Sequence, residues 1–366
     1  MMWMEKVKLS DICSPKQWKT IPTSDLLNEG YPVYGANGII GYYNEYNHEN
    51  PVVTVTCRGA TCGSINITVP KAYVTGNAMC LDDLKNDIEI EYLYYCLKHY
   101  DFKNVISGSA QPQITRQGMD KIYIMLCSRE EQRDIVNKLK KTEKVIKLRK
   151  QELQLLDDLV KARFVEMFGD PVSNPYGYDK VALSDLADIK IGPFGSLLHK
   201  EDYIVGGHPL LNPSHIVDGR ISPDNKLTIS DEKYKELSAY QLKTGDVVMG
   251  RRGEMGRCAV VSEEGFLCGT GSILIRTKGD VTADYIQKTI SFPSFKKTIE
   301  DMAVVQTMPN LNVPIVSSFE IIKPPIEVQD RYYALVEQVD KSKVEIQKAL
   351  NKTQMLFDSL MQEYFG

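Results

Sequence analysis

The sequence predicts an α+β fold in which two globular α/β domains are separated by two long helices, arranged as an internal repeat with pseudo-two-fold character. The first observation behind this prediction is a stretch that occurs twice, at 130–169 and 327–366. Gln132 matches Gln329 and the offset (329 − 132 = 197) also joins Phe168 to Phe365, so the copies align without a gap. The second observation is that a similar order of short strands and turns precedes each copy.

Each copy of the repeat has the pattern of one long helix. Apolar residues recur at alternating spacings of four and three, which over several heptads is typical of a coiled coil. Neither copy contains proline, and glycine occurs only at the end, as a stop signal. Each helix would be roughly 55–60 Å long. The heptad positions are Ile135, Leu139, Thr142, Ile146, Arg149, Leu153, Leu156, Val160, Arg163 and Met167 in copy one, and Tyr332, Val336, Val339, Lys343, Ile346, Leu350, Thr353, Phe357, Leu360 and Tyr364 in copy two.

The charges of the two copies favour packing of one helix against the other. The window 129–169 carries 11 basic and 8 acidic residues, and the window 326–366 carries 5 and 7. The net charges of +3 and −2 are therefore opposite in sign. A heptad pattern shows an apolar face but not which element packs against it. An alternative is therefore that each amphipathic helix lies only on its own domain.

The stretch before the first long helix reads as short strands with one clear helix. Runs rich in β-branched residues predict strands at 52–56, 65–69, 72–74 and 122–126, and the apolar spacing of Leu93 and Leu97 predicts a helix over 90–98. An Arg-Gly turn at 57–63 follows the first of these strands, and a polar loop spans 107–116. Short strands with one or two helices indicate an α+β domain.

The same layout returns after a linker rich in helix breakers, 169–177. The run 181–186 echoes 7–12, and 208–212 echoes 31–35. The strand and Arg-Gly turn return at 246–256, and the polar loop returns at 303–311, with Gln306 matched to Gln111. The globular parts thus share a layout but little identity.

Composition excludes several classes of protein. The net charge of −4 argues against binding of nucleic acid by bulk positive charge, although local basic surfaces remain possible. The N-terminus lacks the pattern of a signal peptide, and no apolar run approaches the ~18 residues of a membrane span. We expect no membrane association and a cytoplasmic location. The eight cysteines include no CxxC pair, so we expect free thiols.

Together these features resemble the specificity subunit of type I restriction-modification systems. The resemblance rests on EEQRDIVNKL at 130–139 with its echo at 327–336, on the Phe-Gly helix ends, and on two diverged units that each hold an Arg-Gly turn and a Gln-containing loop. It covers the whole chain. This chain departs from the family in having little sequence before the first domain and in stopping at Gly366. We therefore expect any terminal segment that joins the two ends of the repeat into a closed ring to be short or absent.

The resemblance implies a domain plan and partners. It implies target-recognition domains at 1–127 and 170–325, spacer helices at 128–169 and 326–366, and an antiparallel coiled coil of the two helices. It further implies a non-catalytic subunit that reads a bipartite, asymmetric site in double-stranded DNA. The implied partners are two adenine-N6 methyltransferase subunits and restriction/translocase subunits. S-adenosylmethionine and ATP would belong to those partners, so no cofactor is expected for this chain.

No motif of the sequence supports catalysis or a metal site. Phosphate-loop and HExxH zinc motifs are absent. Pro223-Asp224 with Asp231-Glu232-Lys233 fits a nuclease pattern only loosely, and His199, His208 and His215 lack cysteine or carboxylate partners at metal spacing. The alternatives to DNA recognition are a nuclease or methyltransferase that acts alone and a coiled-coil scaffold that does not bind DNA.

DNA reading needs donors and acceptors on loops that reach base edges. Arginine reads guanine and Asn or Gln reads adenine, whereas half or more of such hydrogen bonds go to the DNA backbone. The Asn and Gln side chains could instead cap turns. Tyrosines in 31–46 could stack on an extruded base or be half-buried strand residues. The predicted DNA-binding residues are Thr56, Arg58, Thr61, Gln111, Gln113, Arg116, Asn212, His215, Arg251, Arg252, Arg257, Gln306, Asn310 and Asn312.

Overall fold

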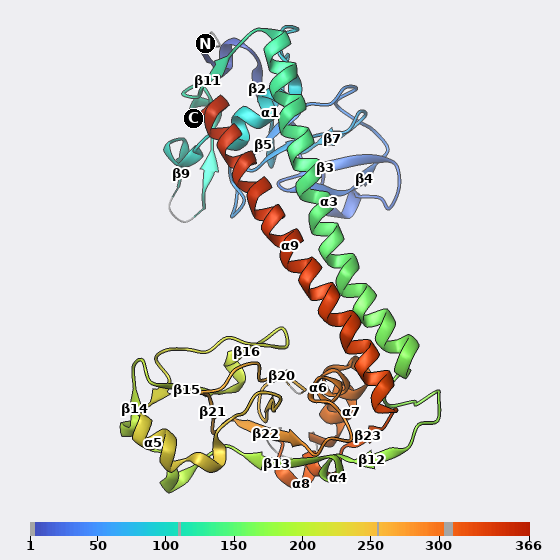
Figure 1. Cartoon of the computed structure of the whole chain (residues 1–366). Coiled ribbons are helices and arrows are strands. Elements are labelled where there is room, and N and C mark those ends of the chain that lie inside the picture. Colours follow the sequence, from blue (N-terminus) through green and yellow to red (C-terminus); the bar gives the residue numbers. More distant parts are fainter. Residues whose placement is uncertain (1–3, 109–110, 255, 304–309) are drawn as a thin grey trace. The chain divides into compact units, whose positions relative to one another are not determined.

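The computed structural model describes residues 4–108, 111–254, 256–303 and 310–366. It divides into two compact units (Figure 1). The first unit comprises Met1–Leu153 and Glu345–Gly366, and the second comprises Gln154–Val344. Each unit therefore holds one globular part and a stretch of both long helices.

The first unit confirms the predicted elements to within a few residues. The expected helix at 90–98 is α1, and the four expected strands are β5, β6, β7 and β11. The elements of its globular part are β1 (Glu5–Lys8), β2 (Ser14–Gln17), β3 (Tyr31–Gly35), β4 (Gly38–Tyr43), β5 (Val53–Thr56), β6 (Ile65–Ile67), β7 (Tyr73–Val74), β8 (Ala78–Asp82), α1 (Ile90–His99), β9 (Ile106–Ser107), β10 (Gln113–Ile114), α2 (Arg116–Met119) and β11 (Tyr123–Leu126).

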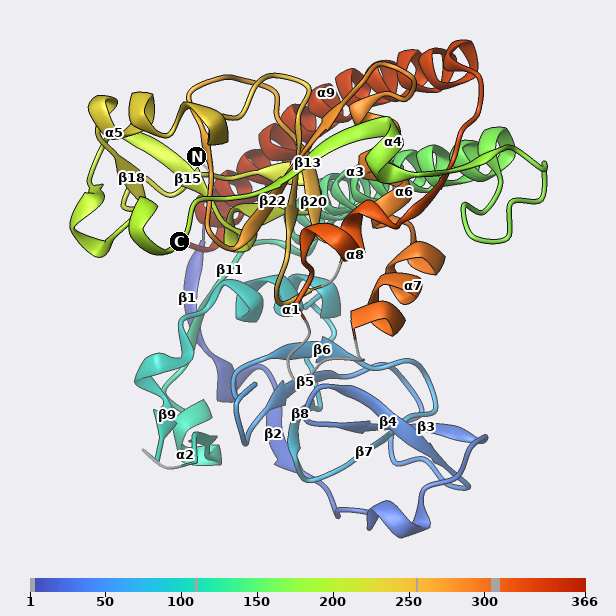
Figure 2. The same cartoon turned by 90° about the horizontal axis from the view of Figure 1, so that it is seen from below.

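A four-stranded antiparallel sheet in the order β2-β8-β5-β6 is the centre of the first unit. Its two faces are both covered because alternate residues of a strand point to opposite sides. On β8, Met79 and Leu81 join the apolar cluster that contains α1, whereas Ala78 and Cys80 join a second cluster with Tyr34 of β3. Figure 2 shows the sheet between α1 and the strands β3, β4 and β7. β1 pairs with β11 in a separate antiparallel ribbon.

The second unit repeats this topology. Its central sheet has the order β13-β22-β19-β20, β15 pairs in parallel with β21 as β3 does with β7, and β12 pairs with β23 as β1 does with β11. Its elements are β12 (Lys180–Ala182), α4 (Leu183–Leu186), β13 (Ala187–Ile191), β14 (Tyr203–Ile204), β15 (His208–Leu211), β16 (Ile216–Val217), β17 (Arg220–Ile221), β18 (Thr228–Ile229), α5 (Asp231–Glu236), β19 (Val247–Gly250), β20 (Cys258–Val260), β21 (Leu267–Cys268), β22 (Ser272–Thr277), α6 (Ala283–Ser291), α7 (Pro293–Ala303), α8 (Val313–Ser317) and β23 (Glu320–Ile322).

The two repeat copies form the long helices α3 (Arg129–Phe168) and α9 (Ile326–Phe365). In the first unit, Lys138 contacts Tyr364 and the guanidinium of Arg149 donates to the carbonyl of Ala349. In the second unit, the hydroxyl of Tyr332 donates to the carbonyl of Val160 at 3.2 Å, and Lys343 contacts Asp157. Higher residue numbers on α3 meet lower numbers on α9, so the helices contact each other and run in opposite directions within each unit.

A buried glutamine fastens each long helix to the globular part of its unit. The side-chain oxygen of Gln132 accepts a hydrogen bond from the Glu89 amide at 2.8 Å, just before α1. The side-chain oxygen of Gln329 accepts from the Thr282 amide at 2.9 Å, just before α6. Both glutamines are almost fully buried. A helix leaves its first amides without internal partners, so these contacts satisfy groups that the short helices cannot satisfy themselves.

Among the described residues, no helix is long and apolar enough to cross a lipid bilayer.

Candidate DNA-recognition surface

The Arg-Gly turn and the Gln-containing loop, fifty residues apart in the sequence, are joined in the first unit. The Ile114 amide donates to the Cys57 carbonyl at 3.0 Å, and the Gly59 amide donates to the Pro112 carbonyl at 3.1 Å. Arg58 pairs with Gln113 as an isolated antiparallel bridge. Gly59 has φ +87°, a conformation that favours glycine because it lacks Cβ, so the turn needs this residue.

Five of the predicted residues present exposed side chains on or beside these two loops. Within the described part of the chain, the polar atoms of these side chains have no protein hydrogen-bond partner. They are therefore available to bind a ligand. These residues are Arg58, Thr61, Gln111, Gln113 and Arg116.

The second unit joins its corresponding loops in the same way. The Leu311 amide donates to the Arg251 carbonyl at 2.9 Å, as Ile114 does to Cys57. Nε of Arg251 donates to Oδ1 of Asn310 at 3.0 Å, and burial, with a contribution from neighbouring Arg252, lowers the pKa of Arg251. The Arg252 side chain is exposed. Arg252 thus occupies the position of Arg58, and Asn310 occupies that of Gln113.

An ion-pair group follows the Arg-Gly turn of the second unit. Arg257 lies 2.6 Å from a carboxylate oxygen of Glu254, and Lys296 lies 3.0 Å from its other oxygen. These two cations, Arg257 first, lower the pKa of the Glu254 carboxyl. Among the described residues, Glu254 pairs with Arg257 and Lys296 and not with the neighbouring Arg252.

Four of the predicted residues have roles inside the fold. The hydroxyl of buried Thr56 donates to the Ala36 carbonyl. Oδ1 of Asn212 accepts from the Gly271 amide at 3.3 Å, and Nδ1 of buried His215 lies 2.8 Å from the Leu210 carbonyl. Oδ1 of Asn312 accepts from the Ile315 amide at 3.0 Å and so caps α8, which is the capping alternative expected for this loop.

The equivalence of Ile114 and Leu311 fixes the register of the two polar loops. Their offset is 311 − 114 = 197, the same as in the long helices. Thr115 caps α2 as Asn312 caps α8, again 197 residues apart. The expected match of Gln111 to Gln306 is not tested by this register. Gln306 itself lies outside the described residues.

The tyrosines of 31–46 pack mainly against each other and the sheet. Tyr31 and Tyr46 meet edge to face with ring centroids 4.8 Å apart, and Tyr43 meets Tyr73 at 5.8 Å. Tyr34 is buried, and its hydroxyl accepts from the Val69 amide at 3.2 Å. These contacts favour the interpretation as half-buried strand residues for Tyr31, Tyr34 and Tyr43, whereas Tyr42 and Tyr46 are exposed.

The residues of the loose nuclease pattern are held in separate contacts. Oδ1 of Asp224 accepts from the Lys226 amide at 2.9 Å within a turn. The carboxylate of Asp231 lies 3.1 Å from Nε2 of His208, whereas Lys233 pairs with Glu236 at the same distance. The pattern therefore gives no support to a nuclease centre here.

Comparison with known proteins assigns this two-unit fold to a class. A model of the type I restriction modification DNA specificity domain matches residues 2–157 and 175–353. The solved type I restriction-modification S subunit from M. genitalium has the same fold over 100% of this chain and 96% of its own, with a TM-score of 0.65 and 15% identity. A second similar structure is a chain from work on complex assembly and conformational transition of the type I R-M system. The match covers 99% of this chain and 97% of that chain, with a TM-score of 0.62 and 17% identity.

Two characterised relatives match in sequence. The MjaVIII specificity subunit of Methanocaldococcus jannaschii is 20% identical over 323 residues, which are 80% of this chain and 75% of that subunit. The EcoprrI specificity subunit of Escherichia coli is 28% identical over 102 residues, 28% of this chain and only 25% of that subunit. The chain belongs to the DNA specificity family of type I restriction-modification systems.

Proposed function

We propose that this chain reads a bipartite, asymmetric site in double-stranded DNA, one half with each unit. The observation that carries the proposal is the joined pair of loops, which recurs on the same scaffold in both units. An exposed arginine occupies the equivalent position in each, Arg58 and Arg252, while the residues around them differ. A shared scaffold with different side chains suits two different half-sites.

The exposed groups have the chemistry that base reading requires. Arginine donates two parallel hydrogen bonds to O6 and N7 of guanine, and the amide of Gln113 can pair with adenine in the same bidentate manner. Arg116 and Thr61 lie beside them and can hold the DNA backbone. In the second unit Asn310 already accepts from Arg251, so Arg252 is the principal candidate for a base contact there.

Charge-conserving variants test the proposal. Arg58→Lys and Arg252→Lys retain a phosphate contact but lose the planar bidentate donor pair. If each arginine reads a base, each lysine variant should weaken binding of a different half-site by about 1–3 kcal/mol. The measurement is affinity of the assembled complex for duplexes altered in one half-site at a time. Equal weakening on all sequences would assign the arginines to the phosphates, and an effect of both on one half would contradict one unit per half.

We also propose that α3 and α9 form an antiparallel coiled coil that fixes the spacer between the half-sites and relates the two halves by an approximate two-fold axis. The opposite direction of the helices within each unit supports this proposal, as do the shared strand orders. Matching buried contacts support it as well, since Gln132 and Gln329 serve the same function 197 residues apart.

The partners would be two methyltransferase subunits and restriction/translocase subunits, which would supply catalysis, while this chain has no catalytic role. Exposed apolar side chains on the long helices support a docking surface, because large apolar groups in water favour association. They include Leu148 (53% exposed) and Leu155 (60%) on α3. Leu155→Glu should reduce co-purification of a methyltransferase subunit, and Gln151→Glu, a polar and exposed site on the same helix, should not.

A further inference from the structure

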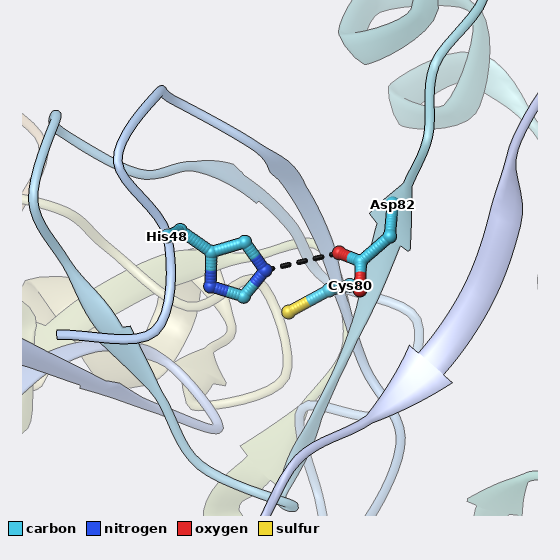
Figure 3. A group of neighbouring side chains, drawn as sticks. All are labelled: His48, Cys80 and Asp82. Carbon is cyan, nitrogen blue, oxygen red and sulfur yellow. Dashed lines mark hydrogen bonds and ion pairs between the residues drawn. The ribbon is translucent and has the colours of Figure 1, made fainter.

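Three potential metal ligands converge in the first unit. They are His48, Cys80 and Asp82, whose ligand atoms all lie within 4.8 Å of one another (Figure 3). Cys80 and Asp82 are two residues apart on β8 and so share one face of the strand. His48 comes from the loop after β4, and backbone hydrogen bonds with Ala72 hold it in place.

Asn47 determines which nitrogen of His48 carries hydrogen. The side-chain amide of Asn47 donates to the Val74 carbonyl at 3.0 Å, and its Oδ1 accepts from the Val74 amide at 2.9 Å. The orientation of the amide is therefore fixed by the backbone of β7. The same Oδ1 lies 2.6 Å from Nδ1 of His48, so Nδ1 must donate. In the neutral ring, Nε2 then presents a lone pair.

The Nε2 atom of His48 faces the Asp82 carboxylate. Nε2 of His48 lies 3.0 Å from Oδ1 of Asp82, and neither atom has a hydrogen to share unless a proton or a cation lies between them. Nε1 of Trp18 can only donate, and it donates to the other carboxylate oxygen of Asp82 at 3.1 Å. The carboxylate is thus held as an acceptor whose remaining oxygen points at the imidazole.

The third group makes the cluster a donor set for a metal ion. Cys80 is fully buried, and the side chains of His48 and Asp82 are only 10% and 13% exposed. Burial first, and the Asp82 charge second, raise the pKa of the Cys80 thiol, so a metal ion would have to displace its proton. One imidazole, one thiolate and one carboxylate are ligands typical of zinc, and the two anions would balance its charge.

We propose that His48, Cys80 and Asp82 bind a zinc ion, with water completing the coordination. A hydrogen bond from the other ring nitrogen to a fixed acceptor is what zinc-binding histidines usually have, and Asn47 provides it. The site joins the loop after β4 to β8 of the central sheet. Zinc would therefore stabilise the packing of the strands β3, β4 and β7 on the sheet that positions Arg58.

The test uses the full-length chain freed of metal with a chelator. Zinc is titrated in competition with a chromophoric chelator, and cobalt(II) is titrated separately for its thiolate-to-metal charge-transfer absorption. We expect one zinc per chain and a charge-transfer band with cobalt. Cys80→Ala should abolish the band and weaken zinc binding by at least about 100-fold, since loss of a ligand exceeds the 10–100-fold cost of losing an outer-shell partner.

Cys268→Ala is the matched control, because Cys268 is also a fully buried thiol but lies in the second unit. It should keep both the zinc affinity and the cobalt band. If Cys80→Ala does not fold, the cobalt spectrum of the unaltered chain decides on its own. Absence of the band there, or unchanged zinc binding in Cys80→Ala, would overturn the proposal and leave a proton between His48 and Asp82.

Discussion

Asn312 lies in a loop that the sequence marks for base contact, yet its side chain caps α8. Replacing a capping Asn with Ala costs about 0.5–2 kcal/mol, whereas Ser caps as well as Asn. We therefore expect Asn312→Ala to lower the free energy of unfolding by about 1 kcal/mol and Asn312→Ser to leave it nearly unchanged, as measured by urea unfolding.

The serine variant separates the two roles of Asn312. If the side chain serves only as a cap, Asn312→Ser should bind DNA as the unaltered chain does. A stable Asn312→Ser that loses discrimination in one half-site would instead show that the amide reads a base.

Single residues also show where sequence reasoning stops. The loops that carry Arg58 and Gln113 were predicted, because Gly-rich turns and polar residues are visible in sequence. The sequence does not show which side chains stay free, because this depends on partners distant in the chain, such as Gly271 for Asn212 and Ala36 for Thr56. The convergence of His48 with Cys80 and Asp82 was missed for the same reason, and β8, which places Cys80 and Asp82 on one face, was not among the predicted strands.

At the scale of elements, the long helices were the most predictable part, since a sustained heptad pattern repeats one signal many times. Both were expected within a residue or two of their ends. The strands β14 and β18 and helix α5 were not predicted. The two strands have two residues each and the helix has six, which is too few for a periodic pattern to stand out from a loop.

A cross-helix ion pair in the second unit gives a test of helix pairing. Nζ of Lys343 contacts Oδ1 of Asp157, and Asp340 lies 3.9 Å from the same ammonium. Lys343→Glu would place three acidic side chains together and should lower the free energy of unfolding by about 1 kcal/mol, the scale of partly exposed pairs. The double variant Asp157→Lys/Lys343→Glu should recover part of that loss.

A double-mutant cycle by chemical denaturation measures this coupling. Asp158→Lys, a change at the neighbouring exposed position of α3, serves as the control and should show no coupling to Lys343→Glu. Strict additivity of Asp157→Lys and Lys343→Glu would contradict a contribution of this pair to helix pairing.

At the scale of the whole molecule, the proposed ruler predicts how the DNA spacer responds to helix length. One heptad adds about 10 Å to a helix, and successive base pairs are about 3.4 Å apart. Inserting one heptad into both α3 and α9 should therefore lengthen the preferred spacer by about 3 base pairs without changing either half-site. Binding to a library of spacer lengths measures this.

Insertion into one helix alone is the control, because it breaks the match between the two helices. It should lower stability and not yield a new spacer preference. If the double insertion keeps the original spacer, the helices do not set the distance between half-sites.

The buried glutamines have a consequence for amide hydrogen exchange. Amides at the start of a helix normally exchange quickly with solvent, because no carbonyl of the helix reaches them. The Glu89 and Thr282 amides are exceptions, since each is held by a side chain of a long helix. Their exchange can slow only while that helix is docked. Deuterium uptake at these two amides thus reports local opening of α3 in the first unit and of α9 in the second separately, in the same sample and without any added probe.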